Sequence, residues 1–443
     1  MAFDLVIRGA TVVTATGMHL ADVAVSNGKV EGLGDFAQVD ADEIVDARGL
    51  YLLPGAIDTQ VHFREPGMEQ KEDLASGSLA ALCGGVTSFL EMPNTKPETT
   101  SPEALADKVT RASGRCWSNF GFFFGATPAN AEHLAEYELL PGAPGVKIFV
   151  GSSTGDLLVD QEDDLRRVLM NGHKRVAVHS EDEARNRERK ALISDNPHPR
   201  EHPFLRDAES AKISTERLIR LCRETHRPVH ILHISTADEL PLIAEAKRQG
   251  LPITCEITPQ HLWFAAPECY DRLGTRAQMN PPVRSEKHRA ALWRALDDGL
   301  FDVFGSDHAP HTAEEKAKPY PSSPSGMPGV ETILPVLLTY AAQGRISYET
   351  LVRMFCETPA ALYQIEGKGR IEIGYDADFV LVDPHRRWTV DQSLLHSKCG
   401  WSPYDGEELI GQVQAVYLAG SLAAFEQEPV GNPMGRCLQF GDH

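Results

Sequence analysis

Residues 52–66 read LLPGAIDTQVHFREP, and this stretch decides how the rest of the chain is interpreted. An apolar run (52–57) leads into alternating polar and apolar positions, a pattern typical of a strand leaving a buried core. Alternate side chains of a strand share one face, and the polar ones here are Asp58, Gln60, His62 and Arg64. A histidine, a carboxylate and an arginine on one face are unfavourable in a core and suit a metal site. A solvated strand edge is the alternative.

Length and composition indicate a soluble globular protein. The chain has 443 residues, which fits one large barrel plus an accessory domain. Apolar residues make up 42% and charged residues 24%, as is ordinary for a globular fold. The formal charge is −20, from 43 basic and 63 acidic side chains. Binding of a nucleic-acid backbone needs clustered Lys and Arg, so we expect no nucleic-acid partner.

The eight cysteines are scattered and form no CxxC pair, so free thiols in a reducing compartment are expected. The first residues, MAFDLVIRGATVV, lack a basic segment followed by a long apolar one. No run approaches the ~18 apolar residues of a membrane span. We therefore expect a cytoplasmic protein with no membrane association.

The middle of the chain alternates between strand-like and helix-like segments. Several of the helix-like segments begin with Ser, Thr or Asp and end in Gly, as capped helices do. The strand-like segments are 52–63, 86–93, 119–126, 145–151, 175–181, 228–235, 252–259 and 303–310. Eight strands alternating with helices predict a (β/α)8 TIM barrel over residues 52–365. A Pro- and Ser-rich stretch after the last strand, residues 311–329, is typical of an active-site loop.

Both ends of the chain are rich in β-like segments that break at Gly. A hairpin turn is predicted at Ser26–Asn27–Gly28. The pattern of the first 51 residues recurs after residue 366. We expect residues 1–51 and 366–443 to form one small β-sandwich domain built from both termini.

Five polar residues fall at the carboxyl ends of the predicted barrel strands, which is the catalytic rim of this fold. They are His62, Lys147, His179, His233 and Asp307. Any one of them alone could be a satisfied core residue. Because they come from five different strands at the same end, a shared site is the better interpretation. Histidine nitrogens and carboxylate oxygens are ligands for zinc or a similar divalent ion.

Several segments, in this order, carry a family resemblance. They are HFREP (62–66), EMPNT (91–95), ITPQHL (257–262), MNPPVR (279–284) and GSDHAPHTAEEKA (305–317). Together they resemble the amidohydrolase superfamily and, within it, the dihydroorotases of the class I type. The superfamily resemblance spans the whole chain, including the two-ended β domain. It implies the reversible hydrolysis of dihydroorotate to N-carbamoyl-aspartate in pyrimidine biosynthesis.

The resemblance also implies roles for the rim residues. His62 and Asp307 would bind one zinc ion, and Asp307 would act as general base and then acid. His179 and His233 would bind a second ion, and a carboxylated Lys147 would bridge the two.

Other class I members bridge the metals with an aspartate, at a position where this chain has Gly151–Ser152–Ser153. That absence favours Lys147 as the bridge. The alternative for Lys147 is a charged strand-end residue paired with an acid.

The substrate would be held by residues from four segments. By resemblance, Arg64, Asn94 and His311 would bind the substrate carboxylate, since a guanidinium fork matches a carboxylate. Asn280 would contact the ring, and the Ser325–Gly326 backbone would add hydrogen bonds.

Gln60 departs from the family, whose first strand opens with His-x-His. An amide oxygen is a poorer zinc ligand than an imidazole nitrogen. One metal site is therefore expected to be weakened, or only one ion to be held, mainly by His179 and His233.

Three readings of the function follow. We favour an active dihydroorotase, because only one of the family's ligands has changed. The expected assembly is a homodimer. An inactive homologue that serves as structural partner of aspartate carbamoyltransferase is the second. Another cyclic amidohydrolase, an allantoinase or hydantoinase, is the third.

Overall fold

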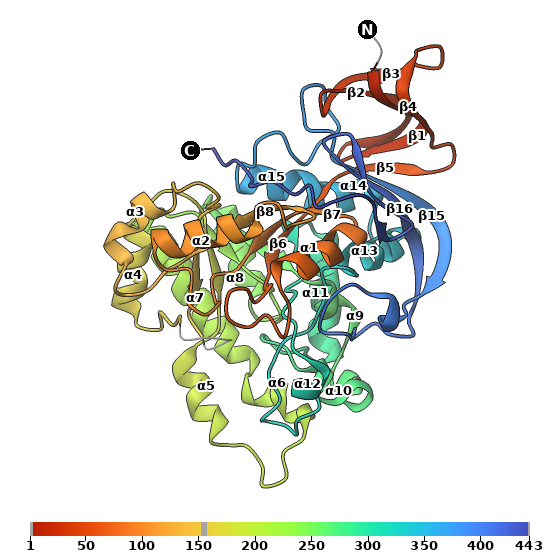
Figure 1. Cartoon of the computed structure of the whole chain (residues 1–443). Helices are drawn as coiled ribbons and strands as arrows, with labels where there is room; N and C mark the ends of the chain where they lie inside the picture. The colour runs from red at the N-terminus through yellow and green to blue at the C-terminus, as the bar shows by residue number, and fades with distance from the viewer. Residues whose placement is uncertain (1–2, 152–156, 442–443) are drawn as a thin grey trace.

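The computed structural model describes residues 3–151 and 157–441, and a closed barrel of parallel strands forms its centre (Figure 1). The barrel strands are β6 (Ala56–Val61), β7 (Val86–Glu91), β8 (Asn119–Phe122) with β9 (Phe124–Gly125), β10 (Val146–Phe149), β11 (Val176–His179), β12 (Val229–Ile231), β13 (Ile253–Ile257) and β14 (Val303–Phe304). Strands β6, β7 and β8 form one hydrogen-bonded run, and β9 to β14 form the other.

Two joints close these runs into a ring. Only Phe123 separates β8 from β9, so one stretch of chain belongs to both runs. At the other joint Val61 pairs in parallel with His308, and the N–H of His62 donates to the carbonyl of His308 over 2.8 Å. The predicted (β/α)8 barrel is confirmed.

The barrel strands are buried on both faces, because helices cover the outside and side chains fill the inside. Every residue of β6, β7, β10 and β11 is buried. The matching sequence segments are near-continuous apolar runs, as parallel strands require. A polar side chain within such a run therefore stands out in the sequence.

The larger helices follow the strands in alternation. They are α1 (Leu74–Cys83), α2 (Pro102–Ala112), α4 (Glu162–Met170), α7 (Ala208–Thr225), α8 (Leu240–Arg248), α11 (Glu286–Asp297) and α13 (Ile333–Ala342). Shorter helices lie in the loops: α3 (Leu134–Tyr137), α5 (Glu183–Lys190), α6 (His202–Leu205), α9 (Pro259–Trp263), α10 (Glu268–Leu273), α12 (Ala313–Lys316), α14 (Tyr348–Val352) and α15 (Thr358–Leu362). Asp73 and Asp207 cap the first turns of α1 and α7, because a carboxylate accepts from the free N–H groups of a helix start.

The segment predicted as one strand over 52–63 is two strands that belong to different sheets. β5 (Tyr51–Pro54) pairs with strands from both ends of the chain, and β6 begins the barrel. Gly55 separates them, and its N–H donates to the backbone carbonyl of Asp378 over 2.8 Å. A Cβ at this position would lie 2.2 Å from Oγ1 of Thr87, so only glycine fits the crossing.

Strands from the two ends of the chain form one nine-stranded sheet, visible at the upper right of Figure 1. Its strands are β1 (Phe3–Thr14), β2 (Gly17–Ser26), β3 (Lys29–Gly34), β4 (Ala41–Asp46), β5, β15 (Phe379–Thr389), β16 (Glu408–Leu418), β17 (Ser421–Phe425) and β18 (Glu428–Pro429). β5 joins β1 to β15, and side chains from both ends share one apolar core. The hairpin predicted at Asn27–Gly28 is confirmed, with φ of 52° and 74°. The exact domain limits stay a prediction.

All eight cysteines are free, as expected. Within residues 3–151 and 157–441, no helix is long and apolar enough to cross a membrane.

Candidate active site

The five predicted rim residues lie at the same end of the barrel. His62 follows β6, His233 follows β12 and Asp307 follows β14, whereas Lys147 and His179 lie within β10 and β11. All five are at most 5% exposed. They therefore form a buried polar cluster at the carboxyl ends of the strands.

The structure arranges four of these residues as two pairs. Nε2 of His62 lies 3.4 Å from Oδ1 of Asp307. Nδ1 of His179 lies 3.1 Å from Nε2 of His233. Two ligands that each sit 2.0–2.1 Å from a tetrahedral zinc are ~3.4 Å apart. Both pairs therefore have the spacing of two ligands on one divalent ion.

Lys147 lies close to both pairs. Burial lowers the pKa of His62, His179 and His233, and the charge of Lys147 lowers these pKa values further. No three His, Cys, Asp or Glu side chains of the described residues converge on one point. Lys147 was predicted as the further ligand, and its charge acts on all three histidines.

The Lys147 amine fits a carboxylated lysine better than an ion-paired one. Its Nζ is buried and has no hydrogen-bond partner in the part of the chain that the structure describes. Burial lowers its pKa to about 7, against the opposing charges of Asp307 and Glu256. A neutral amine is the form that adds carbon dioxide. Of the motif that favoured Lys147 as bridge, Ser152 and Ser153 lie outside the described residues.

Burial also raises the pKa of the Asp307 carboxyl to about 6, although the nearby charge of Lys147 opposes this shift. A carboxyl with a pKa near neutrality can both accept and release a proton during a reaction. The electrostatics therefore suit the predicted role of Asp307.

Two outer partners orient the histidine rings. Oδ1 of Asn94 lies 2.7 Å from Nδ1 of His62, and an amide oxygen only accepts, so Nδ1 carries the proton. The lone pair of Nε2 then faces Asp307. Asn94, predicted to bind substrate, thus also contacts the predicted metal ligand His62.

Glu181 is the equivalent partner of His179, and the sequence reasoning missed it. Its Oε2 lies 3.0 Å from Nε2 of His179, and Arg206 binds both of its carboxylate oxygens. Burial alone would raise the pKa of Glu181, but Arg206 and His179 lower it below its ordinary value. β11 ends at His179, so Glu181 lies in the loop after the strand, where the sequence pattern gives it no face and no partner.

Three site residues have left-handed backbone conformations without being glycine. The φ angles are 67° at Arg64, 36° at His233 and 44° at Asp307. Each such residue costs about 1–3 kcal/mol and persists where its surroundings hold it. The N–H of His233, for example, donates to Oε1 of Glu256 over 3.2 Å. Strain of this kind clusters at functional sites.

Gln60 lies on the same side of the strand as His62. Its Nε2 donates to Oδ1 of Asp307 over 3.0 Å. Its Oε1 has no hydrogen-bond partner among residues 3–151 and 157–441. The amide therefore acts on Asp307 as a donor.

Arg64 and His311 meet beside the predicted metal ligands. Nε of Arg64 donates to the carbonyl of Pro310 over 3.1 Å, and Nη2 lies 3.5 Å from Nε2 of His311. Nη1 has no partner among the described residues, and the side chain is 1% exposed. His311 also contacts Lys71, which the sequence reasoning missed, and the carbonyl of Ser325.

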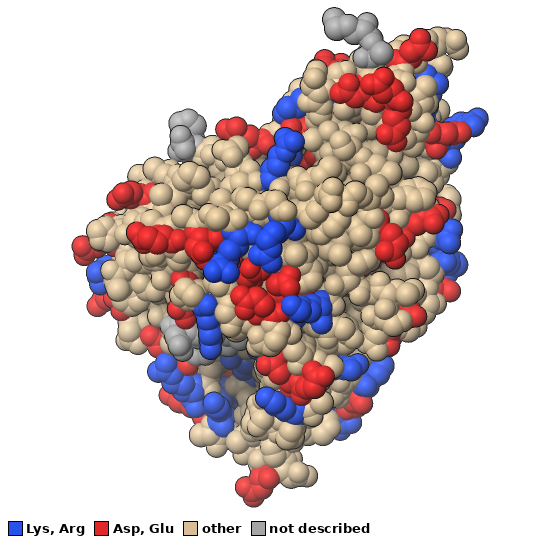
Figure 2. Space-filling view, viewed as in Figure 1, with Lys and Arg blue, Asp and Glu red and all other residues tan. Residues whose placement is uncertain are grey.

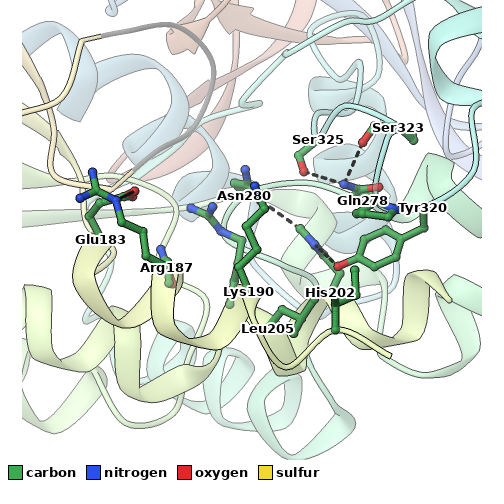
Figure 3. Close-up of a pocket in the computed structure, with 14 residues that line it drawn as sticks. Glu183, Arg187, Lys190, His202, Leu205, Gln278, Asn280, Tyr320, Ser323 and Ser325 are labelled. Atoms are coloured by element: carbon green, nitrogen blue, oxygen red, sulfur yellow. Dashed lines mark hydrogen bonds and ion pairs between the residues drawn. The ribbon is translucent and has the colours of Figure 1, made fainter. Parts of the chain in front are cut away.

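A cavity of about 590 Å³ adjoins the site and is lined by Asn280 and Ser325, among others (Figure 3). Oδ1 of Asn280 accepts from Nε2 of His202 over 2.9 Å. Figure 2 shows a hollow flanked by Lys and Arg side chains where Figure 1 places α5, a helix that contributes to the lining. Arg206 also lines the cavity and links it to Glu181.

The loop over residues 311–329 borders this cavity. Gly326 has φ of 145°, and a Cβ there would lie 2.3 Å from the carbonyl of Ala309. The Nζ of Lys316 donates to the carbonyls of Gln278, Pro324 and Gly326. This buried lysine, not predicted, fixes the loop in place.

Comparison with known proteins places the chain in a family. The profile of the Amidohydrolase family matches residues 51–422. The chain belongs to this family. The match covers the barrel together with β15 and β16 of the end sheet.

Individual relatives of this amidohydrolase have three different names. This chain is 36% identical over 426 residues to a dihydroorotase of Halobacterium salinarum, and the match covers 94% of this chain and 96% of the relative. It is 32% identical over 431 residues to an allantoinase of Bacillus velezensis, covering 95% and 94%. The solved L-hydantoinase (dihydropyrimidinase) from Arthrobacter aurescens superimposes with a TM-score of 0.92 at 28% identity, covering 98% and 99%. The match to a dihydroorotase agrees with the predicted resemblance.

Proposed function

We propose that this amidohydrolase is a metal-dependent cyclic amidohydrolase whose substrate is dihydroorotate, which it hydrolyses reversibly to N-carbamoyl-aspartate. The relatives named dihydroorotase, allantoinase and hydantoinase support the cyclic-amide class. The choice among these substrates depends on the chain's own residues.

The observation that carries the choice is the guanidinium of Arg64. It is buried beside the metal donors and makes no ion pair with the described residues, and Nη1 has no partner. A buried, unpaired charge is costly unless a ligand completes it. A carboxylate matches the guanidinium fork. Dihydroorotate carries a ring carboxylate, whereas the hydantoin and allantoin rings have none.

Each predicted residue has a role in this proposal. A divalent ion, for which we propose zinc, lowers the pKa of a bound water and polarises a carbonyl when held by the rim donors. Asp307 accepts a proton from the attacking water and passes it to the ring nitrogen as the C–N bond breaks. Arg64 and His311 hold the substrate carboxylate, and Asn280 and the Gly326 backbone contact the ring.

A second candidate function rests on Gln60. Since this residue replaces a ligand of the family, the chain could be an inactive partner of aspartate carbamoyltransferase. The other donors argue against this, because both pairs keep the spacing of metal ligands. A homodimer and a cytoplasmic location complete the proposal.

The test is a substrate comparison with the purified chain. With zinc present, we expect hydrolysis of dihydroorotate and little turnover of allantoin, hydantoin or dihydrouracil. Faster turnover of a neutral ring would assign the chain to another cyclic amidohydrolase. No turnover of any ring, together with complex formation with aspartate carbamoyltransferase, would support the scaffold function.

A further inference from the structure

Glu181 lies between a predicted metal donor and an arginine that lines the cavity. The side chain is 0% exposed. Its Oε2 lies 3.0 Å from Nε2 of His179 and also accepts from Nε of Arg206 over 3.1 Å. Its Oε1 accepts from the same Nε over 3.2 Å.

These contacts define the protonation of the His179 ring. A guanidinium only donates, so the carboxylate between it and the imidazole acts as acceptor on both sides. The proton of a neutral His179 therefore lies on Nε2, toward Glu181. Nδ1 then presents its lone pair toward Nε2 of His233, 3.1 Å away.

His233 lacks an equivalent support. Its Nδ1 has no hydrogen-bond partner among the described residues, whereas His62 is held by Asn94. The orientation of the His179–His233 pair thus depends on the hydrogen bond between Glu181 and His179.

We propose that Glu181, held by Arg206, is the positioning residue that directs Nδ1 of His179 into the metal site. This inference rests on the metal site of the proposed function. A carboxylate on the far nitrogen of a ligating histidine fixes its tautomer and increases its basicity, and loss of such a partner weakens metal binding roughly 10- to 100-fold.

The first variant is Glu181→Gln in the full chain, with zinc affinity measured by competition with a chromophoric chelator. Glutamine keeps the volume of the side chain but has only one accepting oxygen for two donors. Zinc affinity is expected to fall roughly 10- to 100-fold.

The matched control is Glu138→Gln. Glu138 is also 0% exposed and binds a buried arginine, Arg227. Its carboxylate also accepts from the backbone N–H groups of His173 and Lys174, and none of these partners among the described residues is a predicted metal ligand. This variant loses a buried ion pair of the same kind and should keep the wild-type zinc affinity.

A second measurement needs no folded variant at position 181. Nitrogen NMR of the metal-free wild-type chain with labelled histidine, assigned with H179Q, should show His179 protonated at Nε2. Protonation at Nδ1 would overturn the inference, as would wild-type zinc affinity in Glu181→Gln or an equal loss in Glu138→Gln. A wild-type chain that binds no zinc would instead overturn the proposed function, while the tautomer measurement would still decide the role of Glu181.

Discussion

Gln60 donates a hydrogen bond from Nε2 to Oδ1 of Asp307 over 3.0 Å, and this oxygen also lies 3.4 Å from Nε2 of His62. The position where the family resemblance expects a histidine ligand thus holds an N–H donor. The donor orients the carboxylate of Asp307 and adds no nitrogen lone pair to the site. A metal ion bound between His62 and Asp307 would therefore have one strong ligand fewer than in a relative with histidine at this position.

Replacing Gln60 with histidine should increase metal binding. The wild-type chain is expected to hold less than two equivalents of zinc, with the His179–His233 pair filled first. Gln60→His should raise the content toward two, because imidazole nitrogen is a better zinc ligand than an amide. Metal analysis after dialysis against zinc measures this, with Gln60→Asn as control. Two tightly held ions in the wild type would contradict the prediction.

Asp307→Asn should remove turnover while leaving the fold intact. The amide has nearly the same volume but cannot accept the proton, so kcat should fall by roughly 10²- to 10⁴-fold. The control is Asp302→Asn, at the other end of the same strand, where the carboxylate binds Lys247. Steady-state assays with circular dichroism compare the two variants. Near-normal activity of Asp307→Asn would remove this residue from its role.

Arg64→Lys should weaken the use of dihydroorotate specifically. A compact ammonium replaces a bidentate fork, and the lost charge-assisted hydrogen bonds correspond to a decrease in kcat/KM of about 10- to 100-fold. Any slow turnover of dihydrouracil, which lacks the carboxylate, should not change. Equal losses with both compounds would show that Arg64 is structural.

Lys147→Met should separate metal binding from stability. Removing a buried amine without a hydrogen-bond partner should leave the metal-free chain as stable or about 1–3 kcal/mol more stable in urea unfolding. The same variant should lose zinc, because the bridging group is absent. A Lys147→Met chain with full zinc content would exclude Lys147 as a ligand.

Glu256→Gln should change how stability depends on pH. Burial raises the pKa of Glu256 from 4.5 to about 8, so the folded chain keeps a proton that the unfolded chain releases between these values. The wild type therefore loses stability as the pH rises through this window. The variant has no such proton. Its free energy of unfolding relative to the wild type should therefore rise by at most about 1.4 kcal/mol per pH unit and level off above pH 8.

Unfolding of both metal-free chains between pH 4.5 and 8.5 measures the difference. A gap that stays constant over this range would show that Glu256 is ionised throughout.

The eight barrel strands could be located from the sequence because parallel strands that are covered on both faces consist of nearly continuous apolar runs. The split at Gly55 was missed, since Pro54 and Gly55 lie inside an apolar run that gives no sign of a change of sheet. The split arises because β5 pairs with β1 and β15 and not with the barrel, and these partners are remote in sequence.

The position of five polar residues at the barrel rim could be predicted, because a polar side chain at the end of an apolar strand is unusual: His62, Lys147, His179, His233 and Asp307. Glu181 and Lys316 could not be singled out. Their roles depend on contacts that only the folded chain makes, such as Arg206 with Glu181 and Lys316 with the carbonyl of Gln278. A charged residue in a loop looks the same in the sequence whether its partner is a protein group or water.

The sequence by itself determined the strand and helix order, the rim residues and the presence of glutamine at position 60, because these follow from local periodicity and residue chemistry. Tertiary structure alone decided what each rim residue touches. The hydrogen bond from Gln60 to Asp307 joins positions 247 residues apart, and it exists because β6 and the end of β14 meet where the barrel closes. Ring closure is a property of the whole chain, so the contacts across it cannot be derived from any one segment.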